Sequence, residues 1–170
     1  MIDKGALSLL ENHIDDLKGI GASSCGVAPE SKIKDTFCIP QAYEIQSINQ
    51  LKQENFGPIL HVIRFKYDGL DGLIEQINNT GYGLTLGIHS RIDHIVDYII
   101  ARARVGNIYV NRGVTGAVVG VQPFGGMGLS GTGPKAGGPH YLTRFTTEKT
   151  VSVNTTAAGG NAHLISLSDD

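Results

Sequence analysis

The chain has 170 residues, of which 41% are hydrophobic and 18% are charged, a balance typical of a globular domain or of part of a larger one. Its 14 basic and 16 acidic residues give a formal charge of -2 without long runs of one sign, which argues against a nucleic-acid-binding surface. No apolar run approaches the roughly 20 residues that a membrane-spanning helix needs, so we expect no membrane span.

Apolar residues recur at helical spacing near the N-terminus, and this stripe predicts a first helix that Gly19 terminates. The stripe consists of Leu7, Leu10, Ile14 and Leu17. Further along, the β-branched run from Ile59 to Phe65 follows a Gly-Pro pair and predicts a buried strand.

The two cysteines, Cys25 and Cys38, belong to no CxxC pair and have no histidines at a matching spacing. This pattern argues against a zinc site and against a disulfide scaffold, so we expect no metal. Free thiols, together with an acidic N-terminus that does not resemble a secretory signal, predict a cytoplasmic protein. Because no basic residue lies near Cys25 in the sequence, an inert thiol is favoured over a nucleophile.

After the predicted strand at residues 59–65, two helices alternate with two further strands. The pattern predicts helices over residues 70–77 and 92–103, and strands over 84–88 and 107–111. We expect Ser90 and Asp93 to form a capping box at the start of the second of these helices, and Gly106 to lie at its end. Strands and helices that alternate with short joints predict parallel βαβ units, and therefore an α/β fold.

Glycine is concentrated between Gly106 and Gly138, where eleven of the 23 glycines lie. Glycine allows positive φ and close approach of a ligand, and long loops of this kind are often functional, so we predict a functional loop. Residues 126–131 match GxGxxG, but Pro123 and Pro134 flank them, so no helix is expected there. The sequence therefore does not support a dinucleotide-binding fingerprint at this point.

The segment from Glu148 to Asn154 alternates apolar and polar side chains. Val151 and Val153 fall on one side of an extended chain, and Thr150 and Ser152 fall on the other. This alternation predicts a half-exposed strand that pairs outside its own sheet.

Four ordered blocks of sequence resemble the aldehyde dehydrogenase superfamily. The blocks are residues 54–58, 81–90, 106–111 and 123–131. Within this superfamily, residues 115–124 and 133–142 are similar to L-glutamate γ-semialdehyde (Δ1-pyrroline-5-carboxylate) dehydrogenases, including the dehydrogenase part of bifunctional bacterial enzymes of proline catabolism. The resemblance extends over essentially the whole chain.

Aldehyde dehydrogenases use an activated cysteine that attacks the aldehyde, transfer hydride to NAD(P)+, and release the acid with a glutamate-activated water. The resemblance implies that both groups precede the first helix, and that residues 1–145 correspond to the C-terminal portion of the catalytic domain. Residues 146–156 correspond to an oligomerisation strand and residues 157–170 to a C-terminal tail. Since neither Cys25 nor Cys38 occupies the nucleophile's motif, no catalytic residue is assigned.

The resemblance also implies a role for five residues. Glu54 matches the glutamate that accepts hydrogen bonds from the nicotinamide-ribose hydroxyls of NAD, and Phe56 matches the aromatic residue beside that ribose. Gly116 and Ala117 match a loop whose backbone N–H groups hold the α-carboxylate of the substrate. Phe124 matches the aromatic residue that packs on the aliphatic part of the semialdehyde.

The sequence thus predicts the C-terminal part of an NAD-dependent dehydrogenase of proline catabolism that oxidises glutamate semialdehyde to glutamate in the intact enzyme. NAD is expected to bind mainly to a domain outside this chain, and this chain alone is expected to be inactive. A homo-oligomer is expected to form through Glu148 to Asn154. A second hypothesis stays open, in which the chain is a non-catalytic remnant or an interaction module that acts through its exposed strand.

Overall fold

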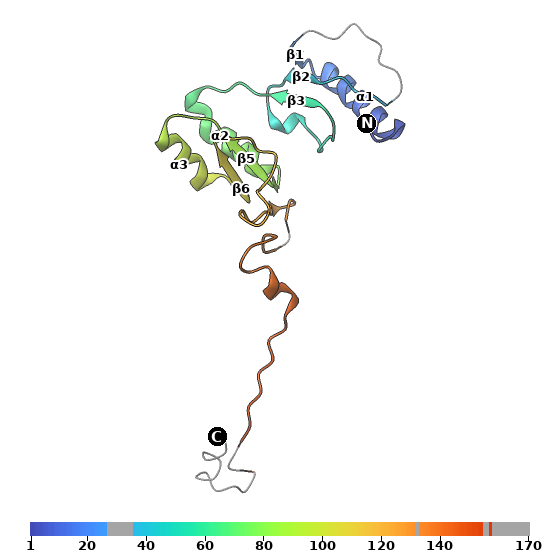
Figure 1. Ribbon diagram of the computed structural model, residues 1–170. Helices are drawn as coiled ribbons and strands as arrows, with labels where there is room; N and C mark the ends of the chain where they lie inside the picture. Colours follow the sequence, from blue (N-terminus) through green and yellow to red (C-terminus); the bar gives the residue numbers. More distant parts are fainter. Residues whose placement is uncertain (27–35, 132, 155–156, 158–170) are drawn as a thin grey trace.

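The computed structural model describes residues 1–26, 36–131, 133–154 and 157. These residues form a body of two units, the first with one three-stranded sheet and the second with two two-stranded sheets, and a C-terminal segment that extends away from the body (Figure 1). No helix in the described residues is both long and apolar enough to cross a bilayer.

The N-terminal unit packs one helix on one sheet. Helix α1 (Lys4–Gly19) is capped by Asp3, whose Oδ1 accepts a hydrogen bond from the amide of Ala6 at 2.7 Å, and it buries Leu10 and Leu17. This confirms the predicted first helix. The sheet has the order β1-β2-β3, comprising β1 (Ser23–Ser24), β2 (Gln41–Glu44) and β3 (Ile59–Val62). Strand β2 pairs parallel with β3 and antiparallel with β1.

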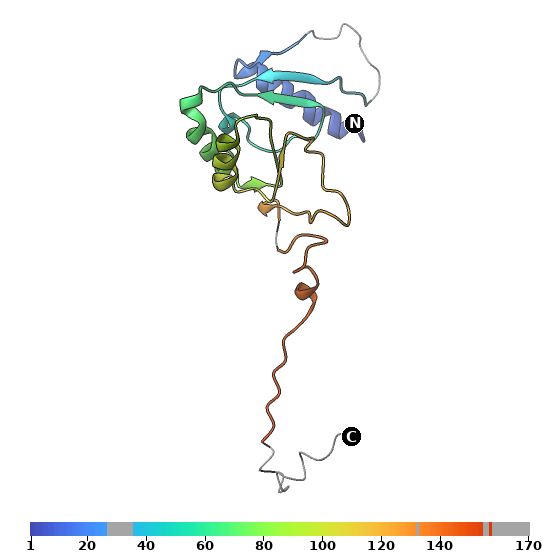
Figure 2. The same ribbon diagram turned by 60° about the vertical axis from the view of Figure 1, so that its left-hand side comes forward.

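The second unit contains the predicted alternation of helices and strands. It is built from α2 (Leu70–Asn79), β5 (Thr85–Ile88), α3 (Asp93–Arg102) and β6 (Asn107–Val110). Strands β5 and β6 are parallel, so that β5, α3 and β6 form the predicted βαβ unit. Figure 2 shows both helices on one side of this unit, while the loop that follows β6 swings out on the other side.

Strands β3 and β5 do not pair, so β3, α2 and β5 do not form a second one of the predicted βαβ units. The ladder of β3 is made with β2, where Gln41 lies opposite Ile59 and Glu44 lies opposite Val62. Sequence analysis did not predict β2, because it is only four residues long and has a polar residue at each end. Strand β3 is an edge strand of this sheet, and β5 belongs to a separate sheet with β6.

The capping box predicted at Ser90 and Asp93 is wrong. Helix α3 has Ile92 at its N-cap and no side-chain cap. Ser90 instead forms a turn, since its Oγ accepts a hydrogen bond from the Ile92 amide at 3.1 Å. Its backbone exchanges two hydrogen bonds with the side chain of Asn111, at 3.0 and 2.9 Å, which ties the start of α3 to the end of β6.

The glycine-rich stretch folds back on the second unit. Its strand β7 (Met127–Gly128) pairs antiparallel with β4 (Tyr82–Gly83), and Ser130 Oγ accepts a hydrogen bond from the Gly83 amide at 3.0 Å. Gly128 has a φ of 59°, and a Cβ there would lie 2.4 Å from the carbonyl oxygen of Gly81. The GxGxxG residues therefore form a tight turn against β4, with no helix opening among them.

The C-terminal segment begins after the short helix η3 (Leu142–Phe145). Residues 146–154 are exposed and are assigned to no strand, and Val151 and Val153 are 70% and 74% exposed. Figures 1 and 2 both show this segment extending away from the body. Its pairing with another subunit stays a prediction, and the predicted tail at 157–170 lies outside the described residues apart from Ala157.

Candidate functional site

A groove of about 860 Å³ lies between the two units, and we call it the inter-unit groove. One wall comes from the segment that follows β2, with Glu54 and Phe56 among its lining residues. The other wall includes Ile77 of α2, Tyr82 of β4 and Ser130 of the glycine-rich stretch. Both residues expected to contact a nicotinamide ribose therefore line the same groove.

Glu54 and Phe56 present accessible groups to this groove. Glu54 is exposed, and its carboxylate makes no hydrogen bond or ion pair with the residues that the structure describes. The ring of Phe56 is 77% exposed. An unengaged carboxylate can accept two hydrogen bonds from a vicinal diol, and an accessible aromatic ring beside it offers an apolar contact to a sugar. The residues present thus fit the ribose of a nicotinamide nucleotide.

A pair of histidines supports the loop that carries these two residues. The Nε2 atoms of His13 on α1 and His61 on β3 lie 2.9 Å apart, with the rings edge to face. The Nδ1 atom of His13 lies 3.3 Å from the side-chain nitrogen of Asn55, the residue between Glu54 and Phe56. This contact network connects the loop to α1 and β3.

Burial lowers the pKa of both histidines, because it disfavours the charged ring. The neighbouring ring of His13 lowers the pKa of His61 further, while the carboxylate of Asp16 partly opposes the effect at His13. A neutral pair also suits the geometry. If Asn55 donates to Nδ1 of His13, that ring carries its proton on Nε2 and donates it to His61.

The proposed substrate loop leaves β6 and contains Gly116 and Ala117. Both residues are half-buried, and Gly116 has a φ of 149°. Within the described residues, neither backbone N–H group makes a hydrogen bond to the chain. Two adjacent free amides around a glycine suit an anion such as a carboxylate. The loop is closed by Gln122, whose Oε1 accepts a hydrogen bond from the Val118 amide at 3.0 Å.

Phe124 is half-buried and lies in a segment fixed by backbone hydrogen bonds. Its N–H and C=O groups pair with Ala136, at 3.0 and 2.9 Å. Both flanking residues bond to the side chain of Asn107, as Pro123 accepts from its Nδ2 at 3.0 Å and Gly125 donates to its Oδ1 at 3.1 Å. Asn107 was not predicted as a site residue, and its signal in the sequence is a polar residue on the buried face of the strand 107–110.

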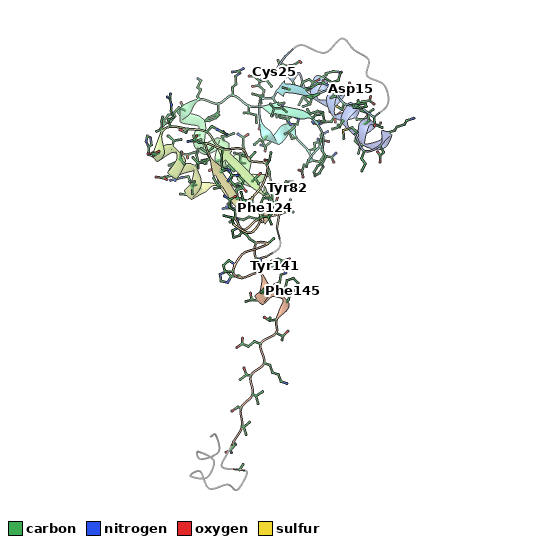
Figure 3. The ribbon with its side chains drawn as sticks, viewed as in Figure 1. Asp15, Cys25, Tyr82, Phe124, Tyr141 and Phe145 are labelled. Atoms are coloured by element: carbon green, nitrogen blue, oxygen red, sulfur yellow. The ribbon has the colours of Figure 1, made fainter. Side chains whose placement is uncertain are left out.

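Of the five predicted site residues, two lie in the inter-unit groove and three lie outside it. Glu54 and Phe56 share the inter-unit groove, whereas Gly116, Ala117 and Phe124 do not line it. In Figure 3, Phe124 lies at the end of the body where the chain continues into the C-terminal segment. The residues expected to bind the cofactor and those expected to bind the substrate therefore form two separate sets in this chain.

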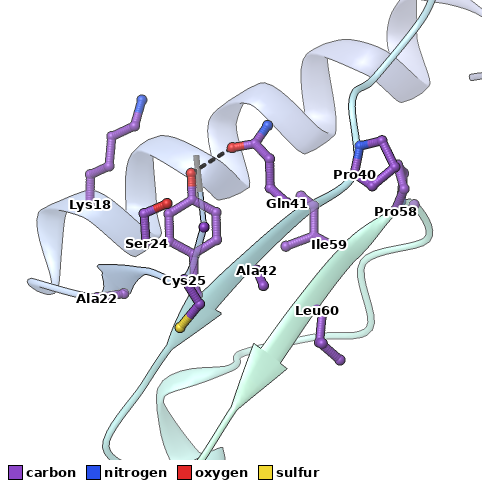
Figure 4. Close-up of a pocket in the computed structure, with 13 residues that line it drawn as sticks. Lys18, Ala22, Ser24, Cys25, Pro40, Gln41, Ala42, Pro58, Ile59 and Leu60 are labelled. Carbon is purple, nitrogen blue, oxygen red and sulfur yellow. Dashed lines mark hydrogen bonds between the residues drawn. The ribbon is translucent and has the colours of Figure 1, made fainter. Parts of the chain in front are cut away.

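The two free cysteines differ in their surroundings. Cys25 lines a second hollow, of about 880 Å³, on the sheet of the N-terminal unit (Figure 4), where its Sγ donates a hydrogen bond to the carbonyl oxygen of Ser23 at 3.7 Å and interacts electrostatically with Arg64. Burial raises the pKa of the Cys38 thiol, the opposite of what a nucleophilic thiolate needs. No group of three or more His, Cys, Asp or Glu side chains in the described part could hold a metal ion.

Residues 1–151 match the model of the aldehyde dehydrogenase family, and the chain belongs to this family. Its mixed α/β architecture with parallel strand pairs agrees with that assignment. The resemblance described from the sequence is thereby confirmed.

Two bacterial enzyme types are similar to the chain. The bifunctional protein PutA of Rhizobium meliloti is 48% identical over 149 residues, which are 86% of this chain and 12% of that protein. A structure of proline utilization A with bound proline has a TM-score of 0.82 and 54% identity, covering 92% of this chain and 16% of the other. NAD-bound 1-pyrroline-5-carboxylate dehydrogenase from Thermus has a TM-score of 0.74 and 33% identity, covering 85% and 28%. The chain thus spans less than a third of each.

Proposed function

We propose that this chain is the C-terminal part of an NAD-dependent dehydrogenase that oxidises L-glutamate γ-semialdehyde to glutamate in proline catabolism. The observation that carries the proposal is the loop at Gly116 and Ala117, whose two adjacent amides are half-buried and unused by the described part of the chain. Such amides match the α-carboxylate that distinguishes this substrate from a simple aldehyde. The similarity to PutA and to 1-pyrroline-5-carboxylate dehydrogenase supports the same substrate.

In this proposal the two residue sets have different tasks. Glu54 accepts hydrogen bonds from the nicotinamide-ribose diol, and Phe56 packs beside the sugar. NAD, when bound, supplies the hydride acceptor. Gly116 and Ala117 hold the α-carboxylate, and Phe124 packs on the methylene groups, where the exclusion of water strengthens the polar contacts.

The catalytic cysteine and glutamate of the reaction are proposed to lie outside this chain. Neither Cys25 nor Cys38 occupies the motif of the family's nucleophile, and burial raises the pKa of the Cys38 thiol. We expect the isolated chain to produce no NADH from glutamate semialdehyde and NAD+. NADH production that survives replacement of both cysteines would contradict this placement of the chemistry.

A chimera tests the function directly. The segment of Rhizobium meliloti PutA that matches this chain is replaced by the corresponding residues of the chain, giving a full-length protein with this site. We expect it to reduce NAD+ with glutamate semialdehyde at a rate comparable to that of the parent. A chimera that folds and binds NAD+ as the parent does, but does not oxidise the semialdehyde, would refute the proposal.

Gly116→Val in the chimera tests the substrate loop. A β-branched residue is strained at a φ of 149° and obstructs approach to the two amides. We expect KM for glutamate semialdehyde to rise at least about tenfold, roughly 1.4 kcal/mol, with little change for an aliphatic aldehyde of similar length. Gly113→Val is the matched control, because a Cβ there meets open space and its φ is not positive. Equal losses for both aldehydes would make the loop purely structural.

A second candidate function rests on the exposed segment 146–154. Its alternating side chains are those of a strand, yet it has no strand neighbour in the described structure. If the chain acts only as an interaction module, deleting residues 146–170 abolishes its self-association, and the chimera shows no dehydrogenase activity.

A further inference from the structure

We propose that Asn107 and Lys135 form a clamp that positions Phe124 for substrate binding, so that Lys135 is a positioning residue for the dehydrogenase reaction. The inference rests on the proposed function, because it assigns Phe124 to the wall of the substrate site. Neither Asn107 nor Lys135 was singled out by the sequence. Both emerge from the hydrogen bonds that surround the segment 123–125.

Asn107 is the one buried polar side chain in the described part of the chain, with 9% of its surface exposed. A buried amide is costly unless its donors and acceptors are engaged. Its Nδ2 donates to the carbonyl oxygen of Pro123 at 3.0 Å, and its Oδ1 accepts from the amide of Gly125 at 3.1 Å. The side chain thus holds the residues immediately before and after Phe124.

Lys135 completes the arrangement from the other side. Its Nζ donates to the Oδ1 of Asn107 at 3.0 Å and also to the backbone carbonyl oxygen of Gly106. The next residue, Ala136, exchanges both backbone hydrogen bonds with Phe124. One cation therefore connects the start of β6 to the segment that pairs with Phe124, and hydrogen bonds from a charged donor are stronger than neutral ones.

The use of a lysine here points to a positioning role. No carboxylate in the described residues forms an ion pair with Lys135, which is half-buried and donates only to neutral oxygens. Desolvation makes such a cation expensive, and an apolar side chain would fill the same space at lower cost. The ammonium group fixes the orientation of the Asn107 side chain, because it donates to the same Oδ1 atom that accepts the hydrogen bond from the Gly125 amide.

Close packing makes Phe124 sensitive to this clamp. A Cβ on Gly106 would lie 1.9 Å from the carbonyl oxygen of Gly125, so β6 and the segment after Phe124 are already in contact. When the clamp is lost, the segment 123–125 loses the hydrogen bonds of Pro123 and Gly125 to Asn107 and keeps its pairing with Ala136 and its contact with Gly106. The place of the phenyl ring relative to the loop at Gly116 is then less tightly fixed.

The test measures kinetics in the chimera with Lys135→Met, which keeps the aliphatic stem and removes the charge. We expect KM for glutamate semialdehyde to rise about fivefold, with kcat and KM for NAD+ within about twofold of the unsubstituted chimera. Lys135→Arg, which still donates to two oxygens, should restore most of the affinity. Lys66→Met is the matched control, because Lys66 is exposed and its side chain makes no contact in the described structure.

A double-mutant cycle with Phe124→Ala decides whether Lys135 acts through that ring. If it does, Lys135→Met raises KM in the parent background and adds little once the ring is gone. An equal effect of Lys135→Met in both backgrounds, or no effect in either, would overturn the clamp.

A readout that does not depend on activity separates this proposal from the proposed function. Hydrogen exchange on the chain itself should show a protected Gly125 amide that loses protection in both Lys135→Met and Asn107→Leu. Unchanged protection in Lys135→Met would overturn the clamp. An inactive but folded unsubstituted chimera would count against the proposed function alone.

Discussion

The side chains of β6 differ in burial and in the contacts that they make. Asn107 and Tyr109 face inward and are buried, at 9% and 5% exposed, while Val110 faces outward. Both polar atoms of the Asn107 side chain have hydrogen-bond partners, whereas the hydroxyl of Tyr109 is buried with no hydrogen-bond partner in the described part of the chain. The guanidinium of Arg112 lies 4.7 Å from the centre of the Tyr109 ring, so the ring is engaged although its hydroxyl is not.

Replacing Tyr109 by phenylalanine should therefore not destabilise the chain. The change removes a buried hydroxyl that has no hydrogen-bond partner in the described part of the chain, and it keeps the ring under Arg112. We expect the free energy of unfolding, measured by urea denaturation, to stay the same or to rise by up to about 1 kcal/mol. A loss of more than about 1 kcal/mol would show that the hydroxyl is engaged after all.

The pair formed by His13 and His61 predicts how stability depends on pH. Their pKa values in the folded chain are lowered from 6.5. At a pH between the folded-state and unfolded-state pKa values, the unfolded chain therefore binds more protons than the folded chain. The stability that the two neutral histidines contribute is fully present above about pH 6.5, and it is lost as the pH decreases from 6.5 toward their folded-state pKa values. Thermal unfolding followed between about pH 8 and pH 5 should show this loss.

Variants identify the source of that pH dependence. Replacing both His13 and His61 by glutamine should flatten the decrease, because neither ring is left to take up a proton. His94→Gln should keep it, since His94 is exposed on α3 and makes no contact in the described structure. A decrease that persists unchanged in the double variant would assign the effect to other groups.

At the level of elements, Gly106 illustrates the difference between a helix end and a site of close approach. The sequence predicted Gly106 at the end of a helix, yet α3 ends at Arg102 with Ala103 as its C-cap. Gly106 instead lies where the segment after Phe124 crosses β6, and a Cβ would lie 1.9 Å from the carbonyl oxygen of Gly125. Because φ at this position is not positive, the backbone conformation does not require glycine. Glycine is required because two backbone segments lie in contact there.

Gly106→Ala should consequently destabilise the second unit. The methyl group collides with backbone atoms, which cannot move aside as a flexible side chain could, so we expect a loss on the order of 2 kcal/mol in urea denaturation. Gly113→Ala adds the same methyl group in open space and should change stability by less than about 0.5 kcal/mol. Equal effects of the two substitutions would mean that the close approach does not exist in solution.

At the level of the whole molecule, apolar surface remains uncovered. Leu60 on β3 is 61% exposed, and Val151 and Val153 alternate with polar residues on a segment without a strand neighbour. Exposed strands with apolar faces tend to pair with other chains. The homo-oligomer expected from the sequence has a physical basis in these features.

Light scattering tests this association. We expect the chain to form an oligomer, and the pair of substitutions Val151→Asp and Val153→Asp to reduce its mass toward that of a monomer. Thr150→Asp with Ser152→Asp adds the same charge on the opposite side of the segment and should reduce the mass less. A monodisperse monomer of the unsubstituted chain, or equal effects of both pairs, would contradict association through this face.

The sequence alone determined the helices, three of the strands and the family. Long apolar stripes such as the one in α1 are local signals, because side chains three and four residues apart share a helix face whatever surrounds them. Ordered motifs identified the family for the same reason, since residues 54–58 and 123–131 keep their order regardless of packing.

Only the tertiary structure decided which strands pair and how the site is held. The pairing of β3 with β2 depends on a four-residue strand too short to have a pattern of its own. Asn107 and Lys135 are 28 residues apart, and their contact exists only because the glycine-rich stretch folds back on β6. Contacts between residues that are distant in the sequence depend on how the intervening loops close, and the local spacing of residues does not predict that closure.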